Sequence, residues 1–133
     1  MEIDQIAGME IDQITGAIVD AAMKVHTALG PGLLESVYET CLKHELVKRG
    51  LKVNSQVWLP VLYDGITIEG GYKMDLLVED EVIVELKVVE QILEIHKAQL
   101  LSYLKLSDKK VGLLINFNVV HLRDGIRRLV NHL

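Results

Sequence analysis

Hydrophobic residues recur at helical spacing in the first third of the chain. The first such series predicts a helix over about residues 11–29 and consists of Ile11, Ile14, Ile18, Ala21, Val25 and Leu29. Gly30-Pro31-Gly32 then interrupts the pattern. A second series predicts a helix over about residues 32–49, which Gly50 can cap. The chain is therefore expected to open with a helix, a tight turn and a helix.

The middle of the chain changes to the pattern of β-strands. Three strands are expected at about residues 51–62, 66–78 and 82–88, and their short connections favour an antiparallel meander. Residues 93–106 return to helical spacing, and the continuously apolar run 111–117 is typical of an interior strand covered on both faces. A last helix is expected over about residues 122–132. The predicted order is ααβββαβα.

Two charges, Glu85 and Lys87, interrupt the third strand, which reads 82-VIVELKV-88. Their position depends on the register of the hairpin formed with the second strand. A two-residue loop would pair Asp75 with Val84 and mix charge with the core. A three-residue loop over residues 79–81 pairs Asp75 with Glu85 instead. That register keeps one face wholly apolar, with Met74, Leu76, Val78, Val82, Val84 and Leu86 on it. We therefore expect Asp75 and Glu85 to face each other.

Carboxylates paired in this way repel each other unless a proton or a cation lies between them. Their Cβ atoms would be about 5 Å apart. A divalent cation with oxygen ligands would relieve the repulsion, and the carbonyl of Leu86 could add a ligand. Lys87 would then be placed to hold an attacking water or a phosphate oxygen. The alternative is an ordinary hairpin with one wet face, which the spacing alone favours because D…ExK patterns often arise by chance.

Two helices carry further polar candidates. His96, Gln99 and Tyr103 form an i, i+3, i+7 stripe beside the apolar side of the helix at 93–106, which suggests a cleft. Glu35 lies in the first turn of the second helix. It can either compensate the helix dipole or serve as a further ligand or water-holding group.

Length and composition indicate one soluble globular domain. The chain has 133 residues, of which 50% are hydrophobic and 25% are charged. Residues 1–8 (MEIDQIAG) are nearly repeated at 9–16 (MEIDQITG). An upstream extension, a cloning remnant or an alternative start at Met9 would explain this repeat, so the domain is assigned to residues 9–133. The single cysteine, Cys41, excludes an internal disulfide and a cysteine-rich zinc site.

Charge and hydropathy limit the binding partners and the cellular location that we expect for the protein. The formal net charge of −5 weighs against long-range attraction to nucleic acid, without excluding a local basic patch. No apolar run is long enough to cross a bilayer, and no signal-peptide pattern begins the chain, so we expect a cytoplasmic protein that does not insert into membranes. A homodimer is a reasonable expectation for so small a catalytic domain.

Together these residues resemble the PD-(D/E)XK nuclease superfamily and, within it, the GxxExxY family. The naming motif stands at 32-GLLESVY-38, and the similarity includes 71-GYKMDLLVE-79, 84-VELKVVE-90, 95-IHKAQLLSYLKL-106 and 112-GLLINFNV-119. The resemblance implies an α/β (α+β) fold with a restriction-endonuclease-like αβββαβ core, in which helices flank a mixed central sheet. It implies that Asp75, Glu85 and Lys87 are the motif residues. Gln99 and Tyr103 resemble a QxxxY motif, Glu35 matches a glutamate from an early helix, and Met74 replaces the usual proline.

The leading hypothesis is a Mg²⁺- or Mn²⁺-dependent nuclease that hydrolyses DNA or RNA. Its metal ligands would be Asp75, Glu85, the Leu86 carbonyl and Glu35, the last directly or through water. Lys87 would act on the nucleophile, while Gln99 and Tyr103 would orient the substrate or Lys87.

Phosphate contacts outside this site are expected from basic residues late in the chain. The candidates are Arg123, Arg127 and Arg128, with Lys105, Lys109 and Lys110.

Two alternatives stay open from the sequence. One is a non-catalytic module for binding nucleic acid or a partner protein, which the acidic balance and few aromatics favour. The other is an enzyme acting on a small phosphorylated metabolite.

Overall fold

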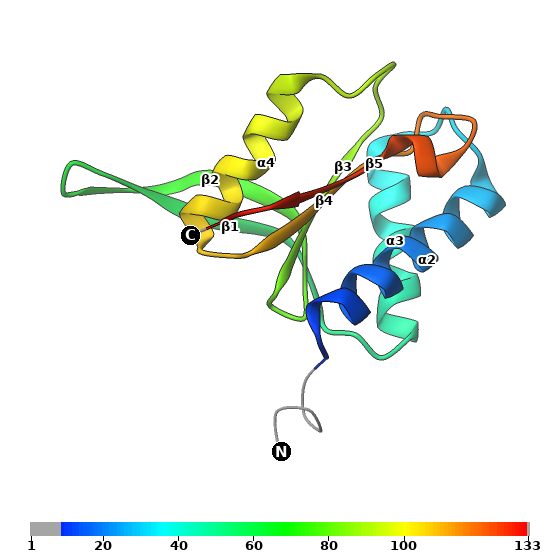
Figure 1. Cartoon of the computed structure of the whole chain (residues 1–133), viewed down its shortest axis with the longest axis horizontal. Coiled ribbons are helices and arrows are strands. Elements are labelled where there is room, and N and C mark those ends of the chain that lie inside the picture. The colour runs from blue at the N-terminus through cyan, green and yellow to red at the C-terminus, as the bar shows by residue number, and fades with distance from the viewer. Residues whose placement is uncertain (1–8, 133) are drawn as a thin grey trace.

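The computed structural model describes residues 9–132 and shows an α+β fold around a five-stranded mixed sheet (Figure 1). The expectation for residues 1–8 lies outside the described residues. The elements follow in the order α2 (Ile11–Leu29), α3 (Glu35–Lys48), β1 (Val53–Tyr63), β2 (Ile66–Val78), β3 (Val82–Lys87), α4 (Glu94–Ser107), β4 (Val111–Asn116), the 3₁₀ helix η1 (Leu122–Gly125) and β5 (Ile126–Val130).

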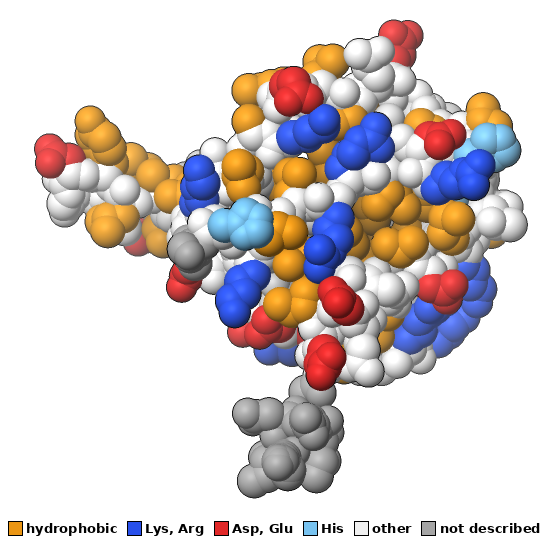
Figure 2. All heavy atoms as spheres, in the orientation of Figure 1, with side chains coloured by type: hydrophobic (Ala, Val, Ile, Leu, Met, Phe, Trp, Pro, Cys, Tyr) orange, Lys and Arg blue, Asp and Glu red, His pale blue; other side chains and the backbone are white. Residues whose placement is uncertain are grey.

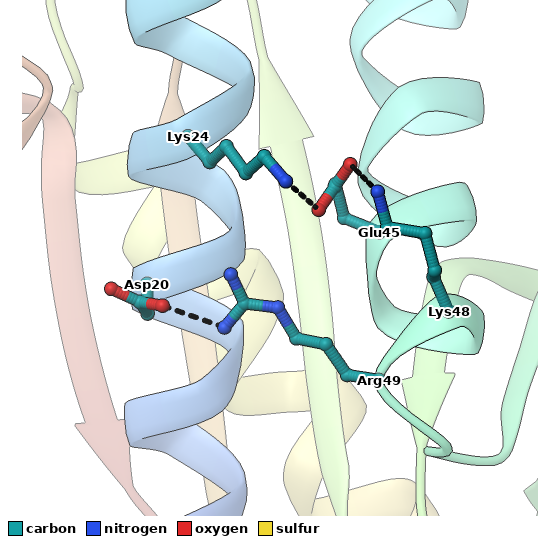
Figure 3. Close-up of polar contacts among 5 residues, drawn as sticks. All are labelled: Asp20, Lys24, Glu45, Lys48 and Arg49. Atoms are coloured by element: carbon teal, nitrogen blue, oxygen red, sulfur yellow. Dashed lines mark hydrogen bonds and ion pairs between the residues drawn. The ribbon is translucent and has the colours of Figure 1, made fainter.

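Helices α2 and α3 lie side by side on one face of the sheet (Figure 1). In α2, Ile14, Ile18, Ala21 and Val25 of the predicted apolar series are buried, whereas Leu29 is exposed. In α3 the buried apolar side chains are those of Tyr38, Leu42 and Leu46. Ion pairs also join the two helices (Figure 3). Arg49 contacts Asp20 at 2.6 Å, and Lys24 contacts Glu45 at 3.2 Å. Helix α3 begins at Glu35 rather than at residue 32, because Gly30 and Gly32 adopt positive φ angles of 72° and 95° in the preceding turn.

The sheet confirms the antiparallel meander of β1, β2 and β3. The strand order is β1-β2-β3-β4-β5, and β4 runs parallel to β3 after the α4 crossover. The turn between β1 and β2 contains only Asp64 and Gly65, both with positive φ, which is typical of a tight hairpin turn. The far end of this hairpin projects from the body of the molecule as a two-stranded arm (Figure 1).

The predicted helix at 122–132 is wrong. The segment forms η1 and then β5, which pairs antiparallel with β4 through Ile126↔Ile115 and Leu129↔Gly112. Strand β4 offers unpaired backbone groups along its outer edge, and five residues can satisfy them more readily than they can nucleate a helix. Arg127 and Arg128 therefore point to opposite faces of a strand.

Two apolar clusters cover the two faces of the sheet. The larger cluster joins α2 and α3 to the sheet and includes Leu76, Val78, Val82, Val84, Leu86, Leu113, Ile115 and Phe117. The smaller cluster joins α4 to the opposite face and includes Tyr72, Met74, Leu77, Ile83, Leu100, Leu104 and Leu114. The central strands β3 and β4 are thus buried on both sides, as expected for 111–117.

Within the described residues, no helix combines the length and apolar character that a bilayer crossing requires.

Candidate active site

The hairpin of β2 and β3 has the register that brings Asp75 and Glu85 together. Leu76 pairs with Val84 and Val78 with Val82, around a loop of residues 79–81. Glu79 and Asp80 have φ angles of 53° and 59°, so the three-residue loop turns through left-handed backbone. Continued by one residue, this register places Asp75 opposite Glu85. The alternative pairing of Asp75 with Val84 does not occur.

The side chains of β2 change faces near Asp75, so the expectation that Met74 and Leu76 share one apolar face is wrong. Leu76 packs toward α2 and α3, whereas Met74 and Tyr72 pack toward α4. Met74 therefore does not share the apolar face of Leu76. The alternation of side chains reverses near Asp75, and the regular pairing of β2 with β3 stops at Leu76↔Val84. Asp75 lies at this break in the sheet.

The two carboxylates occupy the break through reciprocal hydrogen bonds. The backbone N–H of Asp75 donates to Glu85 Oε2 at 2.9 Å, and the N–H of Leu86 donates to Asp75 Oδ2 at 2.9 Å. Side-chain oxygens thus take strand N–H groups where the ladder ends. These bonds fix the orientation of both carboxylates and engage one oxygen of each.

Burial opposes the charge on both groups. Glu85 is only 5% exposed. Desolvation, followed by the nearby charge of Asp75, raises the pKa of Glu85 to about 8. Burial also raises the pKa of Asp75, although the N–H of Leu86 and the charges of Lys87 and Lys73 oppose that increase. The pair consequently favours a proton or a cation between its oxygens.

Glu35 approaches this pair from the N-terminus of α3. The residue as a whole is exposed, but its carboxylate is partly desolvated, which raises its pKa; the charge of Asp75 raises it further and that of Lys87 lowers it. Glu35 is therefore within electrostatic reach of Asp75 and Lys87, rather than isolated in solvent.

Tyr38 fixes the turn that presents Glu35. Its hydroxyl donates to the carbonyl of Gly30 at 2.6 Å and accepts from the N–H of Leu33 at 3.1 Å. The buried ring stacks on Phe117 with centroids 4.6 Å apart. This clamp gives a physical reason for the tyrosine of 32-GLLESVY-38, and the φ of 95° at Gly32 gives one for its glycine.

Helix α4 lies on the other side of the sheet, and its three candidate residues, Tyr103, Gln99 and His96, differ in their contacts. Desolvation and the charges of Glu85 and Asp75 raise the pKa of Tyr103, so its hydroxyl is within electrostatic reach of both carboxylates. Its ring stacks on Tyr72, with centroids 4.7 Å apart. Gln99 is exposed, and no hydrogen bond joins it to the carboxylates within residues 9–132. His96 accepts the N–H of Leu93 through Nδ1 at 2.9 Å and thus caps the helix.

Four residues near the carboxylates were not among the site residues predicted from the sequence: Glu39, Gln56, Lys73 and Asn116. Glu39 lies one turn after Glu35, where i, i+4 spacing could have indicated it, and its charge raises the pKa of Asp75. Gln56 of β1 donates to Glu39 at 2.8 Å. Lys73 lowers the pKa of Asp75 and lies two positions before it on β2.

Asn116 shapes the segment that follows Lys87. It is 1% exposed at the end of β4, and its side chain accepts from the N–H of Val89 at 3.1 Å and donates to the carbonyl of Val89 at 2.9 Å. An asparagine ending an apolar run is the signal that could have revealed this clamp.

The oxygen donors suit a hard divalent cation that keeps part of its water shell. Over the described part of the chain, no three His, Cys, Asp or Glu side chains converge as a ready-made metal site. Mg²⁺ commonly binds through one or two carboxylates together with waters and substrate phosphate. Asp75 and Glu85 match that need, because each has an oxygen beyond the one engaged by a backbone N–H.

Comparisons with known proteins show the fold and the superfamily of the chain. No curated protein matches the chain. A solved chain described as "Crystal structure of SSO0001" is similar over 74% of this chain, with 15% identity and a TM-score of 0.54. The present chain spans about half of that chain's length (51%), and at this identity the likeness shows the fold alone. The family model described as "PD-(D/E)XK nuclease superfamily" matches residues 12–129. A match over nearly the whole length, on a fold that brings its D…ExK residues together, means that the chain belongs to the PD-(D/E)XK nuclease superfamily.

Proposed function

We propose that the protein is a metal-dependent nuclease that cleaves phosphodiester bonds in DNA or RNA at Asp75, Glu85 and Lys87. Superfamily membership supports a nuclease-type function. The observation that carries the proposal is the pair of reciprocal hydrogen bonds that holds two partly desolvated carboxylates at a break in the sheet. A purely structural hairpin would gain nothing from burying Glu85 beside Asp75.

The proposed cofactor is Mg²⁺ or Mn²⁺. Asp75 and Glu85 would hold it, with the carbonyl of Leu86 as a further ligand and Glu35 acting through water. When bound, the cation supplies Lewis-acid stabilisation of phosphoryl charge and lowers the pKa of water. Glu85 must release its proton before it can act as a ligand, because its pKa is raised to about 8.

The remaining residues of the site would position the substrate and stabilise the charge that develops on it. Lys87 lies two residues after Glu85 on β3, and its ammonium group can hold a water or a non-bridging phosphate oxygen. That contact would stabilise charge that grows in the transition state. Tyr103 would orient the substrate or Lys87 from α4, and Gln99 would act at the exposed rim of the same helix.

Basic side chains outside the candidate site are the proposed phosphate contacts. Arg123, Arg127 and Arg128 are the candidates, although the last two already have contacts within the chain. Arg128 pairs with Asp12 at 3.0 Å, and Arg127 Nη1 donates to the carbonyl of Asp124 at 3.0 Å. We also propose membership of the GxxExxY group, on the motif 32-GLLESVY-38, and assembly as a homodimer.

A non-catalytic binding module is the second candidate. It is favoured by the acidic net charge and by a site with two rather than three convergent carboxylates among the described residues. Incubation with single-stranded DNA, duplex DNA, RNA and a nucleotide panel separates these functions when each is run with Mg²⁺, Mn²⁺ or EDTA. Cleavage of a polymer only with metal supports the nuclease. Binding without cleavage under any condition supports the module, and turnover of nucleotides alone supports a metabolite enzyme.

A further inference from the structure

Trp58 is an exposed aromatic side chain where the β1–β2 arm joins the site. It is the only tryptophan in the sequence and is 61% exposed. Its strand neighbours Val57 and Leu59 pack toward α4, so alternation directs Trp58 toward the α3 side of the sheet. Figure 2 shows hydrophobic side chains gathered on the projecting arm. The same hairpin also exposes Leu62, Tyr63, Ile66 and Ile68, and contiguous exposed apolar patches commonly mark binding surfaces.

Lys73 adds a cation to this surface. It pairs with Trp58 across the two strands, and its Nζ lies 5.0 Å from the centroid of the tryptophan ring. This is the distance range of a cation–π contact. The contact holds an ammonium group over one face of the aromatic ring, while the residue keeps most of its exposure. Such a pair can recognise a base and its phosphate at the same time.

The platform formed by Trp58 and Lys73 is continuous with the candidate active site. Lys73 is two residues before Asp75 on β2, which is about 6–7 Å along a strand. Burial raises the pKa of Asp75, and the charge of Lys73 is near enough to offset part of this effect. Gln56 lies two residues before Trp58 and contacts Glu39 on α3. A chain bound at the carboxylates would thus reach the ring with an adjacent nucleotide.

We propose that Trp58 and Lys73 bind an unpaired nucleotide of a single-stranded nucleic acid, with the base stacked on the indole ring and its phosphate paired with the ammonium group. This inference rests on the proposed nuclease function and specifies its substrate as single-stranded at that position. A base inside a duplex is covered by its neighbours and cannot stack on the ring. A second copy of the chain fits less well, because covering the ring would also desolvate Lys73.

The lone tryptophan allows a direct optical test. The protein is titrated in EDTA, which prevents metal-dependent cleavage, with labelled oligothymidine and with a blunt duplex, while anisotropy and tryptophan emission are recorded together. We expect saturable quenching that follows single-strand binding, and unchanged emission with the duplex. Trp58→Ala should weaken single-strand binding about 5- to 100-fold. Leu62→Ala, which removes another exposed apolar side chain of β1, should change it less than twofold.

Lys73 has a separate readout. Lys73→Gln should reduce the slope of log K against log salt concentration by about 0.7, the value for one phosphate contact on a single strand. Lys52→Gln, at an exposed lysine before β1, should leave the slope unchanged.

Several results would overturn the platform. These are no binding of oligothymidine, binding with unchanged Trp58 emission, equal quenching by the duplex, or a blue shift with protein concentration alone, which would show self-association over the ring. Cleavage by the wild type without quenching rejects the platform and keeps the nuclease. Quenching without cleavage of any nucleic acid, in parallel assays with Mg²⁺ or Mn²⁺, keeps the platform and rejects the nuclease.

Discussion

Glu85 has a carboxyl group on a central strand whose surroundings oppose its charge. Desolvation and Asp75 both favour the protonated form, and the N–H of Asp75 gives only partial compensation. The sequence could predict that Asp75 and Glu85 meet, because the apolar set of β3 fixes the register. It could not predict the reversal at Met74, because that depends on where the pairing of two strands stops. Glu39 and Lys73 were open to prediction from their spacing to Glu35 and Asp75, whereas Gln56 of β1 meets Glu39 only through tertiary packing.

The stability of the metal-free protein should fall as pH rises from about 4.5 to 8. The folded-state pKa of Glu85, about 8, exceeds its usual value of 4.5. Between these values the native state retains a proton that the unfolded chain releases, so unfolding becomes easier with pH and levels off above about 8. The slope from this group cannot exceed about 1.4 kcal/mol per pH unit. Urea unfolding across pH measures it.

Glu85→Gln should flatten this pH dependence, whereas Glu81→Gln in the exposed hairpin loop should not. Identical profiles for the wild type and Glu85→Gln would show that Glu85 ionises normally.

Lys87→Ala should lower turnover on the order of 10²- to 10³-fold while changing metal affinity little, because the ammonium group acts on the transition state and is not a ligand. Single-turnover cleavage and metal titration measure the two effects separately. Lys105→Ala, at an exposed position of α4, controls for loss of a positive charge. A parallel loss of metal affinity in Lys87→Ala would contradict the assigned role.

At the scale of elements, the local sequence pattern predicted those helices, strands and turns whose conformation depends mainly on their own residues. Helix α2, the β1–β2–β3 meander and the tight turn at Asp64 and Gly65 follow from spacing and turn residues. Strand β5 does not, because the run 126-IRRLV-130 is too short to have a decisive period and takes its form from the edge of β4. Arg123, Arg127 and Arg128 consequently lie on η1 and β5 instead of on the predicted helix.

Tyr38→Phe should destabilise the fold by about 1–3 kcal/mol, since the carbonyl of Gly30 and the N–H of Leu33 both lose their hydroxyl partner at a buried residue. Urea unfolding gives this difference. Tyr63→Phe, which removes the same hydroxyl from a residue 69% exposed, should change stability by less than about 0.5 kcal/mol. Equal effects of the two substitutions would show that the hydroxyl of Tyr38 does not hold the turn before Glu35.

At the scale of the whole molecule, the fold brings α3, the β2–β3 break and α4 to one place. A cation that binds there only in the folded state should raise the melting temperature by mass action. The stabilisation at 100 times the dissociation constant would be about 2.7 kcal/mol. Thermal melts in Mg²⁺ and Mn²⁺ should show this rise for the wild type and for Asp64→Asn, but not for Asp75→Asn. An equal rise in all three proteins would place the cation elsewhere.

The central claim is that Asp75 belongs to a metal-dependent phosphodiesterase site. The most direct measurement is the single-turnover cleavage rate of the nucleic acid that the substrate panel identifies, in Mg²⁺ or Mn²⁺. We expect cleavage by the wild type and by Asp64→Asn, which makes the same chemical change in an exposed turn. Asp75→Asn, folded by circular dichroism, should be inactive with either metal. Cleavage by Asp75→Asn at the wild-type rate, or cleavage by the wild type in EDTA, would contradict the claim.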